Sequence, residues 1–452
     1  MQSIFSLNTV EFLREIGMRA RPLALACSAA SFLISYLVVL MVHLRYPIVY
    51  GIDGPYYLIQ LRHILLEGAM KYPDPPLTYY LLLPFYLLSE DKNLGLKLAV
   101  AFYGGLTSLI LYLSFRKMGD VSGLTAALTF IISPYTLRLA NDFLKNYVSL
   151  LFIAVFIYVL IKERDERKVV IFSSLSAIAA ALSHVLTYGV LALLSTLILA
   201  FSLIRSNRSK AMIYGAAAAS ITSFLLLAVA LAVAPGIVGY DTNKLLSFLE
   251  NPFGRSSLVF QTQVSFLPSI LIGLAGILYG FLRRSRFSAV ITASGLLLIL
   301  INLPVIGGSW LFRFSLMSSI LIPPIMAIIV GEVKSKAKPT AFLLLVGLMA
   351  MITVPTIRLL RPSISLEEYS ELQEISDHVP LGSSILVPNI KLRYWVEALH
   401  EENYDILEKP PSPSERPHNL YIIVEKRPPL LRLPPRAEII FDGRYLLIAR
   451  LK

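Results

Sequence analysis

The chain has 452 residues, of which 56% are hydrophobic and 15% are charged, against roughly 45–50% and about 25% in soluble proteins. So many apolar side chains cannot all be shielded from water, which excludes a soluble enzyme, a disordered chain and a coiled coil. The formal net charge is +12, and the single cysteine, Cys27, can form no intrachain disulfide. The composition indicates a polytopic α-helical membrane protein.

Eleven segments are predicted to cross the membrane, because a transmembrane helix needs about 20 mostly apolar residues. They are 23–43, 96–115, 121–137, 147–161, 169–183, 185–204, 211–234, 264–282, 287–304, 314–331 and 341–359. The first of them is too long for the core of a signal peptide, and the basic segment before it is long as well. Residues 1–22 are therefore predicted to be a cytoplasmic N-terminal segment and not a cleaved leader.

The distribution of basic residues predicts the orientation. With the N-terminus in the cytoplasm, six short cytoplasmic segments carry 18 of the 41 Lys and Arg residues. The outer segments before the last span carry only 10, over about twice the length, and Lys and Arg concentrate on the cytoplasmic side. An odd number of spans then places the C-terminus outside. Because topology explains the positive charge, it does not indicate a nucleic-acid partner.

Three outer regions are longer than a simple connection. The first, 44–95, has an amphipathic stretch and then an apolar run, 77–88, which is too short to cross and is predicted to be a juxtamembrane helix. The second, 235–263, is predicted to contain a short surface helix. The third, 361–452, has an ordinary composition and is predicted to be a small extracytoplasmic α/β domain. The segment 23–360 is then the transmembrane domain.

Local signals place elements within the C-terminal domain. Ser365-Leu-Glu-Glu368 is a capping-box pattern that predicts a helix running to about Asp377. Residues 384–388 and 419–424 are predicted strands, and 438–448 is a predicted hairpin that turns at Asp442-Gly443.

Two aspartates are the candidate catalytic residues, because ionisable residues at the rim of a membrane are costly and mark functional sites. Asp53 begins Asp-Gly-Pro-Tyr56-Tyr57 in the first outer region, and Asp142 follows Asn141 between the third and fourth spans. Each has a structural alternative. Asp-Gly-Pro also forms an ordinary turn, and Asn141 or Asp142 could cap the helix of the fourth span.

The same side of the membrane carries candidate substrate-binding residues. Arg313 suits a phosphate because its planar guanidinium donates two hydrogen bonds, and Lys145 offers a second cation. The alternative for Arg313 is snorkelling to the lipid headgroups. His184 lies at the turn between the fifth and sixth spans, where a hydrogen-bonded structural role is the alternative. Tyr56, Tyr57 and Asn141 complete the set of candidate residues.

The order of these features resembles the C-type glycosyltransferase (GT-C) superfamily. The shared pattern is one span, a large first outer loop with an acid near its start, juxtamembrane helices, a proline-containing segment and an acid in the second outer loop. Here Asp53, the segment Lys71-Tyr-Pro-Asp-Pro-Pro76 and Asn141-Asp142 match it, over about residues 40–340. The resemblance is to the protein O-mannosyltransferase and aminoarabinose transferase type. It implies a sugar donor linked to a polyprenyl phosphate and a lipid, glycan or protein acceptor.

Three departures from the pattern bear on the site. Gly54 follows Asp53, where related enzymes often carry a second acid, and no Trp-Trp-Asp motif is present. Leu144 stands two residues after Asp142, where the oligosaccharyltransferase branch has an acid that helps to hold a metal. No cofactor is assigned. A divalent metal stays open as an alternative that this pattern does not favour.

The residues predict transfer of the sugar to an acceptor hydroxyl. A phosphate leaving group needs a cation and no strong acid, while the hydroxyl needs one positioned base, so a single displacement with inversion is expected. A polytopic transporter or lipid flippase is the alternative, but the span interiors are nearly free of charge and no repeated halves are found. A second alternative is a non-catalytic scaffold that acts through its C-terminal domain.

Overall fold

The computed structural model describes residues 22–204, 209–233, 266–283, 287–303, 308–412, 417, 419–426 and 437–451. They form two compact units, each assembled from three stretches of the chain. The first unit comprises Met1–Val42, Val100–Ala140 and Lys145–Ile357. The second comprises His43–Ala99, Asn141–Leu144 and Arg358–Lys452.

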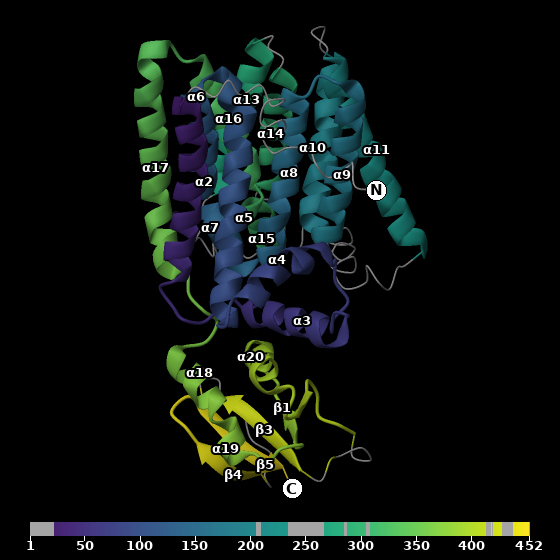
Figure 1. The fold of residues 1–452 in the computed structure, drawn as a ribbon, viewed down its shortest axis with the longest axis vertical. Helices are drawn as coiled ribbons and strands as arrows, with labels where there is room; N and C mark the ends of the chain where they lie inside the picture. Colours follow the sequence, from purple (N-terminus) through teal and green to yellow (C-terminus); the bar gives the residue numbers. More distant parts are fainter. Residues whose placement is uncertain are drawn as a thin grey trace. The chain divides into compact units, whose positions relative to one another are not determined.

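The first unit is a bundle of mostly long helices (Figure 1). Its helices, some of which extend into the second unit, are α2 (Pro22–His43), α5 (Lys92–Phe115), α6 (Asp120–Ile131), α7 (Pro134–Asp142), α8 (Leu144–Lys162), α9 (Glu166–Ser183), α10 (Val185–Ile204), α11 (Lys210–Val233), α13 (Phe266–Leu282), α14 (Ser288–Ile301), α15 (Gly308–Leu316), α16 (Ser318–Glu332) and α17 (Lys338–Leu359). Short 3-10 turns, η1 (Arg116–Met118) and η2 (Ser335–Ala337), precede α6 and α17. Helix α9 packs on α11, α13 on α14, and α6 on α16.

Seven of the described helices are long enough and apolar enough to cross a membrane, and the total is eight if the broken pair α6–α7 counts as one span. Over the described residues, each of the eleven predicted segments coincides with a helix or with two consecutive helices. The chain is a multi-pass membrane protein. The number of crossings and the side on which each terminus lies stay predictions.

The third predicted span is broken. The sequence predicts one helix over 121–137, whereas α6 ends at Ile131 and α7 begins at Pro134 with a bend of 47°. Pro134 explains the break, because the residue before a proline is disfavoured in the α region and a proline suits the first turn of a new helix. As a result, α7 runs past the predicted end of the span to Asp142.

The second unit contains two helices from the first predicted outer region and a small α/β fold. Helix α3 (Gly54–Glu67) packs on α4 (Leu77–Leu88), which agrees with the short apolar helix predicted over 77–88. The α/β part runs α18 (Leu366–Gln373), α19 (Ile375–His378), β1 (Ser384–Leu386), α20 (Ile390–His400), β2 (Asp405–Leu407), β3 (Leu420–Glu425), β4 (Ala437–Asp442) and β5 (Leu446–Leu451).

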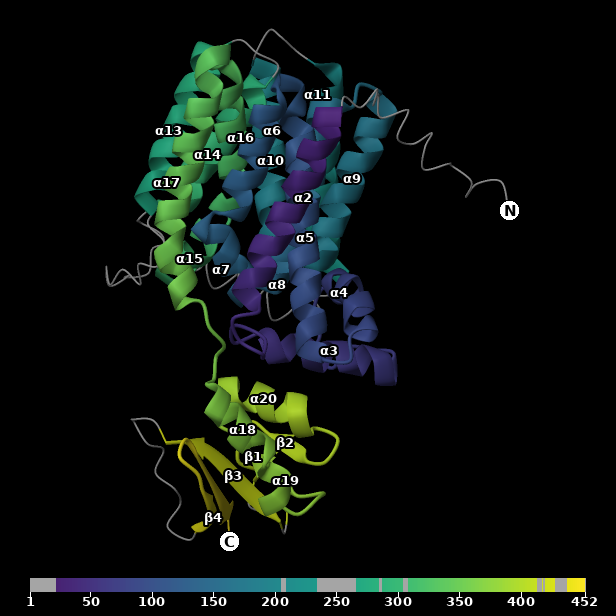
Figure 2. The same cartoon turned by 60° about the vertical axis from the view of Figure 1, so that its left-hand side comes forward.

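The five strands form one sheet in the order β2-β1-β3-β5-β4. Figure 2 labels β1, β2, β3 and β4 together with helices α18, α19 and α20 of the same part. Strands β2, β1 and β3 are parallel, whereas β5 is antiparallel to both β3 and β4. Helix α20 connects the parallel pair β1–β2, as a crossover between parallel strands requires. The central strand β3 is almost entirely buried, so its apolar side chains anchor the core of this part.

Most local predictions for this domain are confirmed, but the single helix predicted to run to about Asp377 is divided at Glu374 into α18 and α19, and two elements were missed. The capping box is present, since the Glu368 N–H donates to Ser365 Oγ (3.1 Å) and the Ser365 N–H donates to the Glu368 carboxylate (2.6 Å). Both predicted strands and the hairpin at Asp442-Gly443 are present. Helix α20 and strand β2 were not predicted. The region 235–263 and almost all of 1–22 lie outside the described residues, and the domain boundaries stay predictions.

Candidate functional site

The segment between α2 and α3 is fixed by polar contacts to the start of α5. Lys97 Nζ donates to the carbonyl oxygens of Tyr46 and Pro47, each at 2.6 Å. The Val49 N–H donates to Asn93 Oδ1 at 3.0 Å. These contacts hold the backbone that leads to Asp53 before α3 begins.

Asp53 is the N-cap residue of α3, and its carbonyl oxygen accepts the Tyr57 N–H at 3.1 Å. Pro55 lies in the first turn, which favours a helix start here. The Asp53 side chain makes no capping hydrogen bond to α3, a helix that is described over its whole length. Asp53 therefore does not cap α3 through its side chain, but it does lie in a turn, which was the structural alternative for this residue.

The segment that carries Asp53 packs against the end of α7. Gly51 has φ +68°, and a Cβ atom built on it would lie 2.5 Å from the Asn141 carbonyl oxygen and 3.2 Å from Asp142 Oδ1. Asn141 Nδ2 also donates to Asp142 Oδ1. The structure thus brings the segments of both predicted acids together within one unit, as expected for a shared site.

Tyr56 and Tyr57 belong to a cluster of aromatic rings beside this segment. Tyr57 is buried, whereas Tyr56 is half-buried and stacks on Tyr72 with ring centroids 5.5 Å apart. The hydroxyls of Tyr56 and Tyr79 both donate to Asp74 Oδ2, at 3.1 and 2.5 Å. Burial first, and the Asp74 carboxylate second, raise the pKa of Tyr56, so its hydroxyl stays a donor.

Asp74 is a candidate residue that the sequence analysis did not select. It lies between Pro73 and Pro75 in the segment 71–76, which was treated only as a proline-containing entry. An acid flanked by prolines in a region rich in tyrosine was the available signal, since proline restricts the backbone and phenols donate to carboxylates.

An ion network joins α3 and residue 71 to α20. Arg62 and Lys71 each pair with Glu401, Lys71 also pairs with Glu397, and His63 Nε2 lies 2.9 Å from Glu401 Oε1. Burial opposes ionisation of Glu401, but the hydrogen bonds from Lys71, His63 and Arg62 outweigh it and lower the Glu401 pKa. The network ties the region after Asp53 to the C-terminal part of the same unit.

The other predicted residues belong to the first unit. Arg313 lies on α15 with its guanidinium carbon 5.7 Å from the Trp310 ring centroid, and Arg138 of α7 lies 5.9 Å from the Phe312 ring centroid. Two guanidinium groups therefore lie over aromatic rings of one short helix, a geometry that cation–π attraction stabilises. Arg138 was not selected from the sequence.

His184 and Lys145 are at helix starts in the first unit. The Leu186 N–H donates to His184 Nδ1 at 3.1 Å, so the ring caps α10 as the structural alternative proposed. Lys145 is the second residue of α8.

A metal site is not formed by the described residues. No group of three or more His, Cys, Asp or Glu side chains in that part of the chain is placed to hold an ion. Asp53 and Asp142 could supply two carboxylates, but a third ligand is not found among the residues that can be described. No chemical step is assigned to a metal here.

Comparison with solved structures identifies the architecture. The chain matches ArnT from Cupriavidus metallidurans in the apo state with a TM-score of 0.62 and 12% identity, and ArnT bound to undecaprenyl phosphate with 0.58 and 13%. Both matches cover 93% of this chain and 97% of the other. The chain has the GT-C fold.

A mycobacterial arabinofuranosyltransferase, AftD, shares this GT-C fold at a TM-score of 0.50 and 13% identity, with 94% of this chain matching 39% of AftD. No family model matches the sequence, and no curated protein matches it significantly. The resemblance inferred from the sequence is therefore confirmed by three-dimensional structure. At such low identity the matches show the GT-C fold alone.

Proposed function

We propose that the chain is a membrane glycosyltransferase that moves a sugar from a polyprenyl-phosphate carrier to an acceptor hydroxyl. One observation carries the proposal: in a chain with the GT-C fold, Gly51 brings the segment of Asp53 against Asp142. ArnT has been solved with undecaprenyl phosphate bound, which supports a lipid-linked donor of the same chemical class. The orientation predicted from the basic residues puts this reaction on the outer face of the membrane.

Asp53 is the proposed general base. The acceptor oxygen attacks the anomeric carbon of the donor while Asp53 takes the hydroxyl proton. The bond from the anomeric carbon to the phosphate oxygen breaks, and its electron pair leaves with the polyprenyl phosphate. A single displacement inverts the anomeric configuration. Asp142, held by Asn141, is proposed to orient the acceptor beside the base.

Arg313 is the proposed cation for the departing phosphate, and Lys145 is the proposed second one. A guanidinium donates two parallel hydrogen bonds to phosphate oxygens, and a fixed cation lowers the barrier most where charge develops. The Trp310 ring restricts the Arg313 side chain, which reduces the entropy lost on binding.

The tyrosines and His184 have supporting roles in this proposal. Tyr56 contacts the acceptor, and buried Tyr57 keeps the first turn of α3 in place. His184 acts through the start of α10, because its Nδ1 already accepts a backbone N–H.

The test is a transfer assay with purified protein in lipid vesicles and a panel of polyprenyl-phosphate sugars. Asp53→Asn should lower the turnover of the best donor by about 10²–10⁴-fold, the usual contribution of a positioned base. Asp377→Asn, an exposed aspartate of the same unit, is the matched control and should retain wild-type turnover. Full activity of Asp53→Asn would exclude this base. The absence of transfer from every donor by the wild type would count against the function itself.

A further inference from the structure

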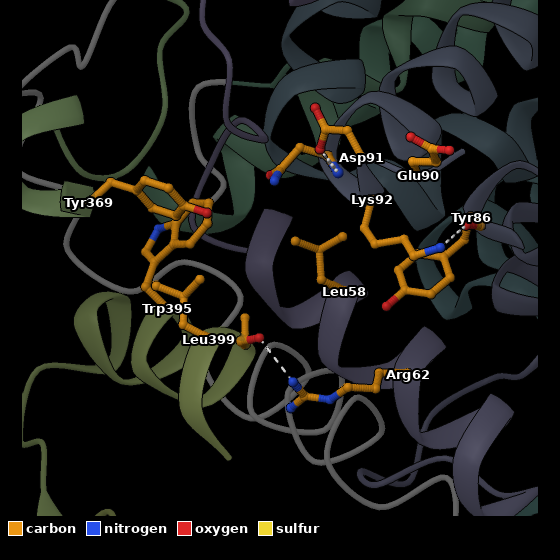
Figure 3. Close-up of a pocket in the computed structure, with 11 residues that line it drawn as sticks. Leu58, Arg62, Tyr86, Glu90, Asp91, Lys92, Tyr369, Trp395 and Leu399 are labelled. Carbon is orange, nitrogen blue, oxygen red and sulfur yellow. Dashed lines mark hydrogen bonds between the residues drawn. The ribbon is translucent and has the colours of Figure 1, made fainter. Parts of the chain in front are cut away.

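A small pocket lies within the second unit, beside α3. Its volume is about 250 Å³, and Leu58 lies between its two walls (Figure 3). One wall is the turn from α4 to α5, with Tyr86 and the run Glu90–Asn93. The other wall carries Tyr369 of α18 and Trp395 of α20. Pockets for drug-sized ligands span roughly 300–1,000 Å³, so this one suits a single small ring.

The charges around the pocket balance. Glu90 and Asp91 contribute two carboxylates, and Arg62 and Lys92 contribute two cations. Both cations already donate to backbone oxygens: Arg62 Nη1 to Ala398 at 2.9 Å, and Lys92 Nζ to Tyr86 at 3.1 Å. Because both cations already donate to backbone oxygens, the pocket does not favour an anionic ligand. Because two positive and two negative side chains line it, it does not favour a strongly charged ligand of either sign.

The pocket offers an aromatic surface on one wall and carboxylate hydrogen-bond acceptors on the other. The Tyr369 and Trp395 rings meet edge to face with centroids 5.3 Å apart, and Trp395 Nε1 donates to Ser363 Oγ at 3.0 Å, which fixes this wall. Glu90 and Asp91 are exposed, and a carboxylate offers about four acceptor sites, of which Asp91 already uses one to accept the Asn93 N–H at 2.9 Å. Such a lining matches a neutral ring with an apolar C–H face and several hydroxyl donors.

The pocket is connected to the segment that carries Asp53. Asn93, in its wall, accepts the Val49 N–H at 3.0 Å. Leu58 follows Asp53 by five residues, a rise of about 7.5 Å along a helix axis. A ligand in the pocket would therefore lie close to the start of α3.

We propose that this pocket binds one neutral sugar ring of the acceptor, so that the acceptor of the reaction is a glycan. The inference rests on the proposed transferase function and adds the substrate class. The sugar hydroxyls donate to Glu90 and Asp91, and the apolar face of the ring lies against Tyr369.

Intrinsic fluorescence provides a test of binding that does not need turnover. The chain has two tryptophans, so Trp310→Phe leaves Trp395 as the only reporter, within the pocket wall. Titration with methyl glycosides of mannose, galactose, glucose and arabinose should give a saturable change for at least one of them. Tyr369→Ala should remove this response. Glu90→Gln, an exposed substitution that should not disturb folding, should weaken it at least tenfold.

Glu374→Gln, an exposed acid away from the pocket lining, is the control and should bind as the parent does. No response to any glycoside, or binding by Glu90→Gln and Tyr369→Ala that equals that of the parent, would overturn the pocket proposal. A parallel transfer assay separates the two ideas. If the wild type transfers sugar, Asp53→Asn does not, and no glycoside binds, the transferase function is supported and the pocket proposal is wrong. If a glycoside binds but the wild type transfers no sugar from any donor, the transferase function is wrong. In a working transferase, Glu90→Gln should raise the acceptor KM at least tenfold with kcat nearly unchanged.

Discussion

Gly51 lies so close to Asn141 that a Cβ atom at residue 51 would approach the Asn141 carbonyl oxygen to 2.5 Å. Real Cβ atoms do not come so near a backbone oxygen, and the φ angle of +68° independently favours glycine. The contact joins two stretches of chain separated by the whole of α3 to α6. The absence of a side chain at residue 51 therefore allows the segment that carries Asp53 to pack against the segment that carries Asp142.

Gly51→Ala should therefore destabilise the second unit and impair transfer. The left-handed conformation costs an alanine about 1 kcal/mol or more, and the clash with Asn141 adds about 1–3 kcal/mol, as overpacking does elsewhere. Thermal unfolding in detergent measures the stability, and the vesicle assay measures transfer.

Gly382→Ala is the matched control for this substitution. Gly382 has a similar φ of +76°, but nothing lies within 4 Å of a Cβ built on it. It should show the conformational cost alone and retain transfer. Equal losses of stability in the two variants would mean that the contact with Asn141 has no energetic consequence.

What could be predicted from the sequence was local or periodic. Apolar segments of the right length predicted the helices, and the capping box at Ser365 and the Asp442-Gly443 turn predicted elements within a few residues of the signal. Contacts between distant residues carried no such signal. Arg62 and Glu401 are 339 positions apart, and the sequence around each of them does not indicate which residue it pairs with.

The candidate site shows the same division. Asp53 and Asp142 were selected because acids at a membrane rim are costly, but the contact between the segments that carry them involves Gly51, which no motif marks. Asp74 was passed over although its signal was local: Tyr79, which donates to it, lies only five residues away, and only its second partner, Tyr56, comes from a separate helix. The break before Pro134 could have been anticipated, since the proline was visible within the predicted span.

Glu401→Gln should destabilise the second unit by about 2 kcal/mol, since hydrogen bonds to a charged partner contribute about 1.5–3 kcal/mol. The glutamine leaves Arg62 and Lys71 without the negative charge that both face. Glu402→Gln, at the next and exposed position, is the control. Both are compared by thermal unfolding at neutral pH. If the two variants unfold at the same temperature, the network of Glu401 does not contribute to stability.

The same glutamate predicts a pH dependence. Its pKa is lower in the folded chain than the usual 4.5, so the unfolded chain takes up the proton first as pH falls. The contribution of Glu401 is fully present above pH 4.5 and is lost as pH falls through the lower folded pKa. The difference in unfolding temperature between the wild type and Glu401→Gln should therefore be constant near neutrality and shrink below pH 4.5. A difference that grew on acidification would contradict this sign.

Arg313→Ala should lower turnover by about 10²–10³-fold, the range seen when a donor that stabilises transition-state charge is removed. Arg313→Lys should recover only part of this loss, because an ammonium keeps the charge but not the planar pair of donors. Free polyprenyl phosphate, the proposed product, should inhibit the wild type more strongly than Arg313→Ala, since the alanine removes the group that holds it. Arg164→Ala, an exposed arginine of the same unit, should change neither quantity. Equal inhibition of the wild type and Arg313→Ala would show that Arg313 does not bind the phosphate. Arg138, which lies over the Phe312 ring of α15, would then be the next residue to substitute.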